Sequence, residues 1–198
     1  MLGMFGTLYA VAFTLGLIRS VEAVVTWPTF ETWLSAVSLA LIGLRLFFSP
    51  EALRQYVEMR ASTTNPVRPT SLALWHFPIL LWQAAVIYAA CFELKEFGVH
   101  LSVPLLATST LALNVLWLVS SIVASFRASI PLSALGHPLI WLINNVASIA
   151  VVLAVVLLCP EHGVVLAAGA LILNSLIDLG FTADWYDQAR CRLAKRWS

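Results

Sequence analysis

Two ionisable side chains, Arg45 and Asp178, lie inside long apolar runs of the sequence. A charged side chain near the centre of a membrane helix costs about 2.5–3.5 kcal/mol on insertion scales, so each such residue suggests a function. With about 1.5 Å of rise per helical residue, both are expected at one depth, a few residues inward from the same membrane surface. An arginine and an aspartate at one depth can form an ion pair, bind an ion or take part in proton transfer.

Amide and imidazole side chains from other apolar runs are expected near the same level. Asn174 precedes Asp178 by one helical turn and therefore shares its face. We expect a polar cluster that could bind an ion, relay protons or hold a small solute, with these members: Arg45, His76, Asn144, Asn145, Asn174 and Asp178. In the alternative interpretation, Arg45 extends toward the membrane surface and pairs with Asp178, and the amides only join helices.

Two further polar contacts are predicted between or along the helices. Gln83 and Asn114 fall near the middles of their apolar runs, where an unpaired amide is costly. We expect both to face the protein interior, where they could bond each other. Arg19 and Glu22 are three residues apart and could pair on one helix face if the first helix continues beyond Ile18.

The sequence offers little support for catalysis. It contains no nucleophile-elbow, zinc-protease or phosphate-binding motif, and its four histidines fall near the ends of apolar runs. We therefore predict no catalytic residues, no metal site and no cofactor. A net charge of +1 without a basic stripe also makes nucleic acid an unlikely partner.

Composition places most of the chain in lipid. Hydrophobic residues make up 61% of the 198 residues and charged residues 11%, whereas roughly 25% of residues are charged in an average soluble domain. The mean hydropathy is +0.91 over the whole chain, and the apolar residues are spread along it rather than confined to a single membrane anchor. We predict an all-α bundle of transmembrane helices, because lipid does not tolerate unpaired backbone groups.

About 20 apolar residues cross a bilayer, and six runs qualify. The first two are short, so four or five spans are the alternatives, and we expect the first run to be a retained span rather than a cleaved signal. The predicted spans are Leu2–Ile18, Thr32–Phe48, Ser71–Phe92, Leu101–Phe126, Pro138–Cys159 and Gly163–Phe181.

The distribution of arginine and lysine predicts the topology. Basic residues concentrate between the second and third runs, at Arg127 and in the tail, whereas the alternate connections hold few. Since basic loops mark the cytoplasmic side, both termini are predicted to be cytoplasmic, in a bacterial inner membrane. We divide the chain into a membrane domain, residues 1–186, and a basic tail, residues 187–198.

The connection after the second run is expected to begin a separate helix. Ser49, Pro50 and Glu51 resemble a helix start, with an N-cap, a proline and an acid. A short amphipathic helix near residues 50–60 would lie on the cytoplasmic membrane surface. The basic residues expected to contact a partner protein or anionic lipid are Arg54, Arg60, Arg68, Arg190, Arg192, Lys195 and Arg196.

The three cysteines do not form a metal or redox motif. The predicted topology brings Cys91 and Cys159 near one surface, so a disulfide between them is conceivable. Cys191 would lie on the opposite side of the membrane.

The functional expectation is a non-enzymatic membrane subunit that anchors or senses and presents a cytoplasmic surface to a soluble partner, in a setting such as bacterial defence or stress response. Membrane lipids and further copies of the chain are the other expected partners. The alternative is a small oligomeric channel or carrier for ions, protons or a solute that uses the polar cluster. An intramembrane enzyme acting on lipid or quinone would need reactive groups that the sequence does not show.

Overall fold

The computed structural model of the chain describes residues 2–61, 69–127, 136–159, 161–181 and 183, and within these ranges the backbone alone at 2–6, 8–9, 46–61, 69–77, 124–125, 127 and 136–137. The described residues form six α-helices and no strand. In chain order the helices are α1 (Leu2–Thr26), α2 (Phe30–Ala61), α3 (Pro69–Phe97), α4 (Ser102–Arg127), α5 (Gly136–Leu158) and α6 (Gly163–Phe181). The predicted all-α bundle is confirmed.

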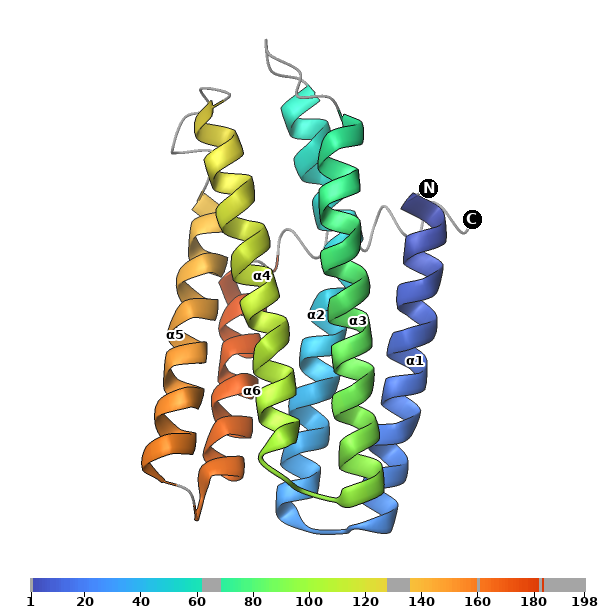
Figure 1. Ribbon diagram of the computed structural model, residues 1–198, viewed down its shortest axis with the longest axis vertical. Coiled ribbons are helices and arrows are strands. Elements are labelled where there is room, and N and C mark those ends of the chain that lie inside the picture. Colours follow the sequence, from blue (N-terminus) through green and yellow to red (C-terminus); the bar gives the residue numbers. More distant parts are fainter. Residues whose placement is uncertain (1, 62–68, 128–135, 160, 182, 184–198) are drawn as a thin grey trace.

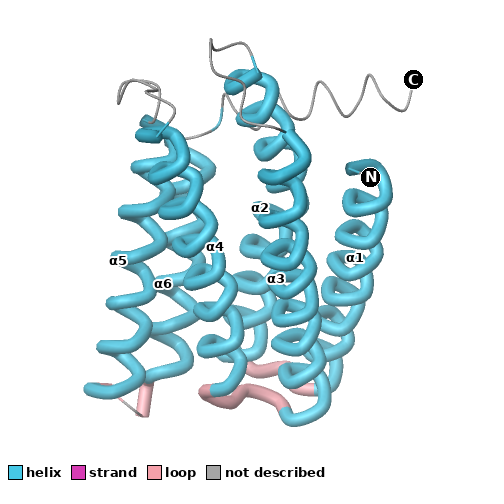
Figure 2. Tube along the Cα trace, turned by 45° about the horizontal axis from the view of Figure 1, so that its top comes forward, coloured by secondary structure: helices cyan, strands magenta, loops and turns pink. Residues whose placement is uncertain are grey.

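The helices run up and down and pack side by side (Figure 1). Neighbours contact one another around the bundle in the order α1, α3, α4, α5, α6 and α2, and α2 closes the ring on α1 while also packing on α3. The turns at residues 27–29, 98–101 and 161–162 lie at one end of the bundle (Figure 2). Consequently α2 and α6, which both begin at that end, are parallel neighbours.

Side chains are distributed as expected for a protein in lipid. Large aliphatic residues such as Leu157 and Leu158 are 77% and 78% exposed, whereas Arg45 and Asp178 are 6% and 1% exposed. Four helical segments are long and apolar enough to cross a membrane: Pro78–Phe97, Ser102–Val123, Pro138–Leu158 and Gly163–Phe181. The prediction of transmembrane helices is supported, while six spans and cytoplasmic termini stay predictions.

Small residues allow close contact within this bundle. A Cβ atom on Gly43 of α2 would lie 2.7 Å from the Phe13 ring of α1, so only glycine lets these two helices approach so closely. At the turn end, Gly98 has a φ of +73°, which favours glycine. The Trp27 ring covers Gly98 and its Nε1 donates to the Lys95 carbonyl oxygen at 3.2 Å. These contacts tie the α1–α2 turn to the α3–α4 turn.

Two predicted boundaries are wrong. Helix α1 continues past Ile18 to Thr26, and α2 continues through Ser49 and Pro50 instead of ending before them. A proline removes one backbone hydrogen bond, but extending a helix avoids the unfavourable nucleation step that a new helix requires. The residues after Pro50 are mostly good helix formers, so one long helix replaces the predicted separate one.

The disulfide that the sequence left open between Cys91 and Cys159 is not formed. Cys91 is buried in α3 and Cys159 is exposed after α5, and both are free thiols. Cys91 packs instead toward α1, where its Sγ atom lies beside Gly16. The division between the membrane domain and the tail lies outside the described residues, as does Cys191.

Candidate functional site

Arg45 of α2 and Asp178 of α6 form a buried ion pair. Arg45 Nε donates to Asp178 Oδ2 at 2.7 Å. Each residue lies fifteen positions beyond the first residue of its helix, which corresponds to roughly 22 Å from the turn end of the bundle. Because α2 and α6 are parallel neighbours, equal distance along the helices brings the two charges to one level.

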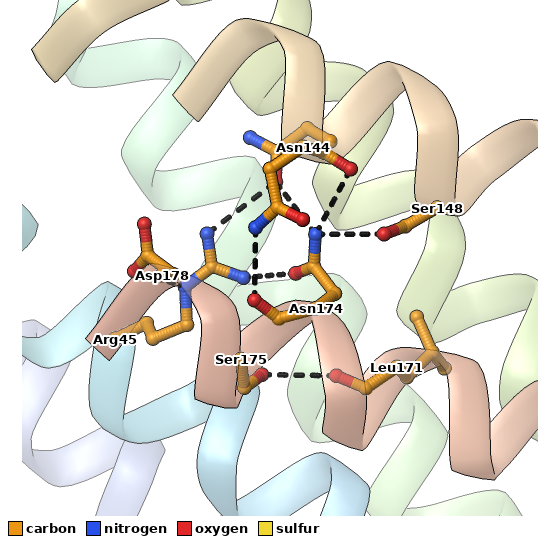
Figure 3. Close-up of polar contacts among 8 residues, drawn as sticks. Arg45, Asn144, Ser148, Leu171, Asn174, Ser175 and Asp178 are labelled. Carbon is orange, nitrogen blue, oxygen red and sulfur yellow. Dashed lines mark hydrogen bonds and ion pairs between the residues drawn. The ribbon is translucent and has the colours of Figure 1, made fainter. Parts of the chain in front are cut away.

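The remaining nitrogens of Arg45 are bound by two asparagines. Nη1 donates to Oδ1 of Asn174, and Nη2 donates to Oδ1 of Asn145 at 3.3 Å. In Figure 3 the guanidinium group reaches from α2 between Asp178 and Asn174 of α6 and toward α5. A guanidinium carries five N–H donors in a fixed plane, and here each of its three nitrogens has an oxygen acceptor supplied by the protein.

Asn144 and Asn174 join α5 to α6 in a reciprocal way (Figure 3). Asn144 Nδ2 donates to the Asn174 carbonyl oxygen at 2.9 Å, and Asn174 Nδ2 lies 3.2 Å from the Asn144 carbonyl oxygen. Asn174 Nδ2 also lies 2.9 Å from Ser148 Oγ and 3.3 Å from Asn145 Oδ1. An amide nitrogen has two hydrogens, so these three acceptors share them. The α5–α6 hairpin is thereby fixed independently of Arg45.

We call this group the buried polar cluster; its members are Arg45, Asn144, Asn145, Ser148, Asn174 and Asp178. Asn174 and Asn145 are fully buried, and Arg45 and Ser148 are 6% and 8% exposed. Breaking a buried ion pair on one side costs about 3–5 kcal/mol, because it leaves an uncompensated charge. The arrangement therefore holds α2 against the α5–α6 hairpin.

The amide of Asn145 is bonded through its oxygen alone. Asn145 Nδ2 is buried and has no hydrogen-bond acceptor, although Oδ1 of the same amide is bonded to Arg45. An unsatisfied buried donor costs about 1–3 kcal/mol. This nitrogen is therefore the point at which the cluster could bind one more oxygen atom, from water or from a solute.

The structure brings together all the predicted members of the polar cluster except His76. His76 lies in α3, but its side chain is outside the described residues. Sequence reasoning missed Ser148, although its position four residues after Asn144 places both on one face of α5. This shared helix face is the feature of the sequence that could have identified Ser148.

Gln83 faces the protein interior as we expected, but it bonds a backbone oxygen rather than Asn114. Its Nε2 donates to the Thr110 carbonyl oxygen at 3.1 Å, and Gln83 is 1% exposed. A helix carbonyl keeps a second lone pair for such a bond, and the long glutamine side chain reaches it on the neighbouring helix. Asn114 is half-buried one turn further along α4.

Hydroxyl groups line the buried face of α2 toward the turn end. Thr32, Ser35 and Ser38 follow one another at intervals of three residues and are at most 2% exposed. The buried aliphatic side chains of Leu39 and Ile42 lie between them and Arg45 along the helix. The hydroxyls therefore do not continue directly into the buried polar cluster.

The basic residues proposed for partner or lipid contact are not described at the level of side chains. Arg54 and Arg60 lie in α2, where the backbone alone is described, and the others, Arg68, Arg190, Arg192, Lys195 and Arg196, lie outside the described residues. Within the described ranges, no group of three His, Cys, Asp or Glu residues could hold a metal ion. No protein-family model, curated protein or solved structure matches the chain.

Proposed function

We propose that this protein is a non-enzymatic integral membrane subunit that anchors or senses in a bacterial inner membrane and presents a cytoplasmic surface to a soluble protein. The observation that carries the proposal is that Arg45 is bound within the protein through all three of its nitrogens. Polar groups so engaged favour a structural role over binding of a transported ion. Contact with the soluble protein is then made by segments at the cytoplasmic end of the bundle.

Charge supports the orientation of the bundle. Glutamates gather toward the end with the described turns, at Glu22, Glu31, Glu93, Glu96 and Glu161, against only Arg19 and Lys95. Seven of the nine arginines in the sequence lie between residues 49 and 70, at Arg127 or in the tail, which are the parts of the chain expected toward the other end. Because basic loops are retained in the cytoplasm, we place that end, and with it both termini, on the cytoplasmic side of a six-span topology.

The proposed docking surface consists of the segment Glu51–Arg68 and the residues after Tyr186. These are the longest basic stretches outside the apolar runs. The same arginines and lysines would attract anionic lipid, at about 1 kcal/mol for each basic residue near the surface. A defence or stress-response system would suit a subunit of this kind.

The test is recovery of a partner from native membranes in mild detergent. Affinity-tagged protein should recover one soluble protein in a fixed ratio. Separate variants that lack residues 51–68 or end after Tyr186 should lose it, whereas substitution of lipid-facing Leu173, which is 58% exposed, should not. Recovery unchanged in both shortened variants, or no partner with the intact protein, would reject the proposed surface.

The alternative is a small oligomeric channel or carrier, and Asn145 Nδ2 is the observation in its favour. This buried donor beside Arg45 could receive an oxygen atom of a solute or of a hydrated ion. Purified protein in liposomes would then carry ions or protons, and Asp178→Asn would abolish the flux. Flux no higher than in empty liposomes would remove the alternative.

A further inference from the structure

Helix α1 carries a charge beside the exposed aliphatic residues on its outer side. One line of residues there follows at intervals of four and three, namely Val11, Leu15, Ile18, Glu22 and Val25, and Leu17 and Val21 beside it are exposed as well. Four residues of this line are aliphatic and between 47% and 77% exposed, and the Glu22 side chain is 44% exposed. Alternating intervals of three and four are the pattern of a helix surface that packs along another helix.

The opposite side of α1 is used for packing within the bundle. Gly16, Ser20 and Ala23 are buried there, and Gly16 lies beside Cys91 of α3. At 3.6 residues per turn, Glu22 lies roughly 100° from Ala23, 120° from Gly16 and 160° from Ser20 around the helix axis. In Figure 1, α1 stands at the edge of the bundle with no other helix on its outer side. Glu22 therefore lies outside the side of α1 that packs on the bundle, with a side chain that is 44% exposed.

Glu22 is paired with Arg19 on the same helix. Arg19 Nη1 donates to Glu22 Oε2 at 2.9 Å, the two side chains are 35% and 44% exposed, and Tyr88 of α3 lies beside Arg19. Arg19 lies seven residues before Thr26, the last residue of α1, which places it roughly 10 Å from the turn end. Trp27, a residue type enriched at the membrane surface, follows immediately. In the proposed six-span topology, on which this step rests, the pair lies below the headgroup level.

We propose that this side of α1, defined by Val11, Leu15, Ile18, Glu22 and Val25, is the interface between two copies of the protein. The copies would be related by a twofold axis perpendicular to the membrane, with α1 against α1. Arg19 of each copy would donate to Glu22 of the other copy and would also stay bonded to Glu22 of its own chain. Such a face is self-complementary, as a twofold interface requires.

Charge complementarity favours a second copy over lipid. One helix face offers both a cation and an anion, so two parallel copies provide each charge with an opposite partner at the same depth. A guanidinium has five N–H donors, which is enough to bridge two carboxylates. Acyl chains offer neither charge a partner. This inference does not depend on the proposed docking surface at the cytoplasmic end.

The first experiment is disulfide cross-linking in native membranes. Cys159 and Cys191 are replaced by serine, buried Cys91 is kept, and single cysteines are introduced as Ile18→Cys, Val25→Cys and Leu173→Cys. Leu173 is 58% exposed on α6 and serves as the matched control. We expect an oxidised dimer at the two α1 positions and none at Leu173. No dimer at either α1 position, or equal dimer at all three, would overturn the proposal.

The second experiment separates pairing between copies from pairing within one copy. In the Ile18→Cys background, one copy carries Glu22→Arg and a second, with a different tag, carries Arg19→Glu. Each variant expressed alone should lose the dimer because like charges meet, and co-expression should restore it as a mixed dimer. An ion pair within one chain cannot be restored by mixing. Retention of the dimer in both single variants would refute the charge pairing, as would failure of co-expressed, monodisperse variants to pair.

Discussion

The two arginine–carboxylate pairs of α1 and α2 have similar lengths and very different surroundings. Arg45 and Asp178 are 133 positions apart in sequence, lie 2.7 Å apart and are 6% and 1% exposed. Arg19 and Glu22 are one helical turn apart, lie 2.9 Å apart and are 35% and 44% exposed. The first pair joins helices that are distant in sequence, whereas the second lies within one helix, with Tyr88 of α3 beside Arg19. The buried pair therefore stabilises the fold, whereas the partly exposed pair is accessible to a second copy of the protein.

Removing Asp178 should give the largest effect of any single substitution in the buried polar cluster. Asp178→Leu leaves the Arg45 charge buried and uncompensated, which costs about 3–5 kcal/mol. We expect strongly lowered yield and thermal stability of the protein in detergent, measured by fluorescence-detected size exclusion after heating. Glu22→Leu is the matched control at the exposed pair and should change these values far less. Equal losses in the two variants would contradict the comparison.

Asn174→Leu should have an intermediate effect. It removes the acceptor of Arg45 Nη1 and the bond from Asn174 Nδ2 to the Asn144 carbonyl oxygen, while the backbone carbonyl of residue 174 can still accept from Asn144 Nδ2. An unsatisfied buried polar group costs about 1–3 kcal/mol, so thermal stability should fall by less than in Asp178→Leu. Leu176→Ala, on the exposed side of the same helix, should leave it nearly unchanged. A loss as small as that of Leu176→Ala would mean that the Asn174 side chain does not stabilise α5 against α6.

The polar cluster was accessible from the sequence because depth can be counted along a helix. Arg45 and Asp178 could be placed at one level from residue number alone, and Asn174 on the Asp178 face from helical spacing. Counting does not say which helices are neighbours. Helix α2 contacts α6, and Arg45 docks onto the α5–α6 hairpin. Both contacts depend on how the helices pack, which cannot be read from a single sequence.

Helix boundaries and individual partners were less predictable. Ser49 and Pro50 have the composition of a helix start, yet α2 passes through them, since the free energy of continuing a helix is not visible in a local pattern. Gln83 donates to a backbone oxygen rather than to Asn114. Every helix has carbonyl oxygens with a free lone pair, so the amino-acid sequence does not indicate which of them a side chain will bond. The Arg19–Glu22 contact depended on α1 reaching Thr26.

Replacing both members of the buried pair should restore much of the stability that one replacement removes. In Arg45→Met with Asp178→Leu, no charge is left in the interior, and apolar substitutes for a buried ion pair are often neutral or stabilising. The amide oxygens of Asn145 and Asn174 still lose a donor, so recovery should be incomplete. Thermal unfolding of the double variant and of both single variants measures the coupling. A double variant as unstable as the sum of the singles would show that the two charges act independently.

The same chemical change at the two pairs gives the smallest and most discriminating effect. Asp178→Asn and Glu22→Gln each replace a carboxylate by an amide of nearly equal volume. The first should lower thermal stability, because Arg45 loses its counter-charge in the interior. The second should change the stability of the detergent-solubilised monomer little, since Glu22 is bonded to Arg19 on its own helix, while weakening the cross-linked dimer formed through Ile18→Cys. A dimer unaffected by Glu22→Gln would place the aliphatic residues, rather than the charges, in control of that interface.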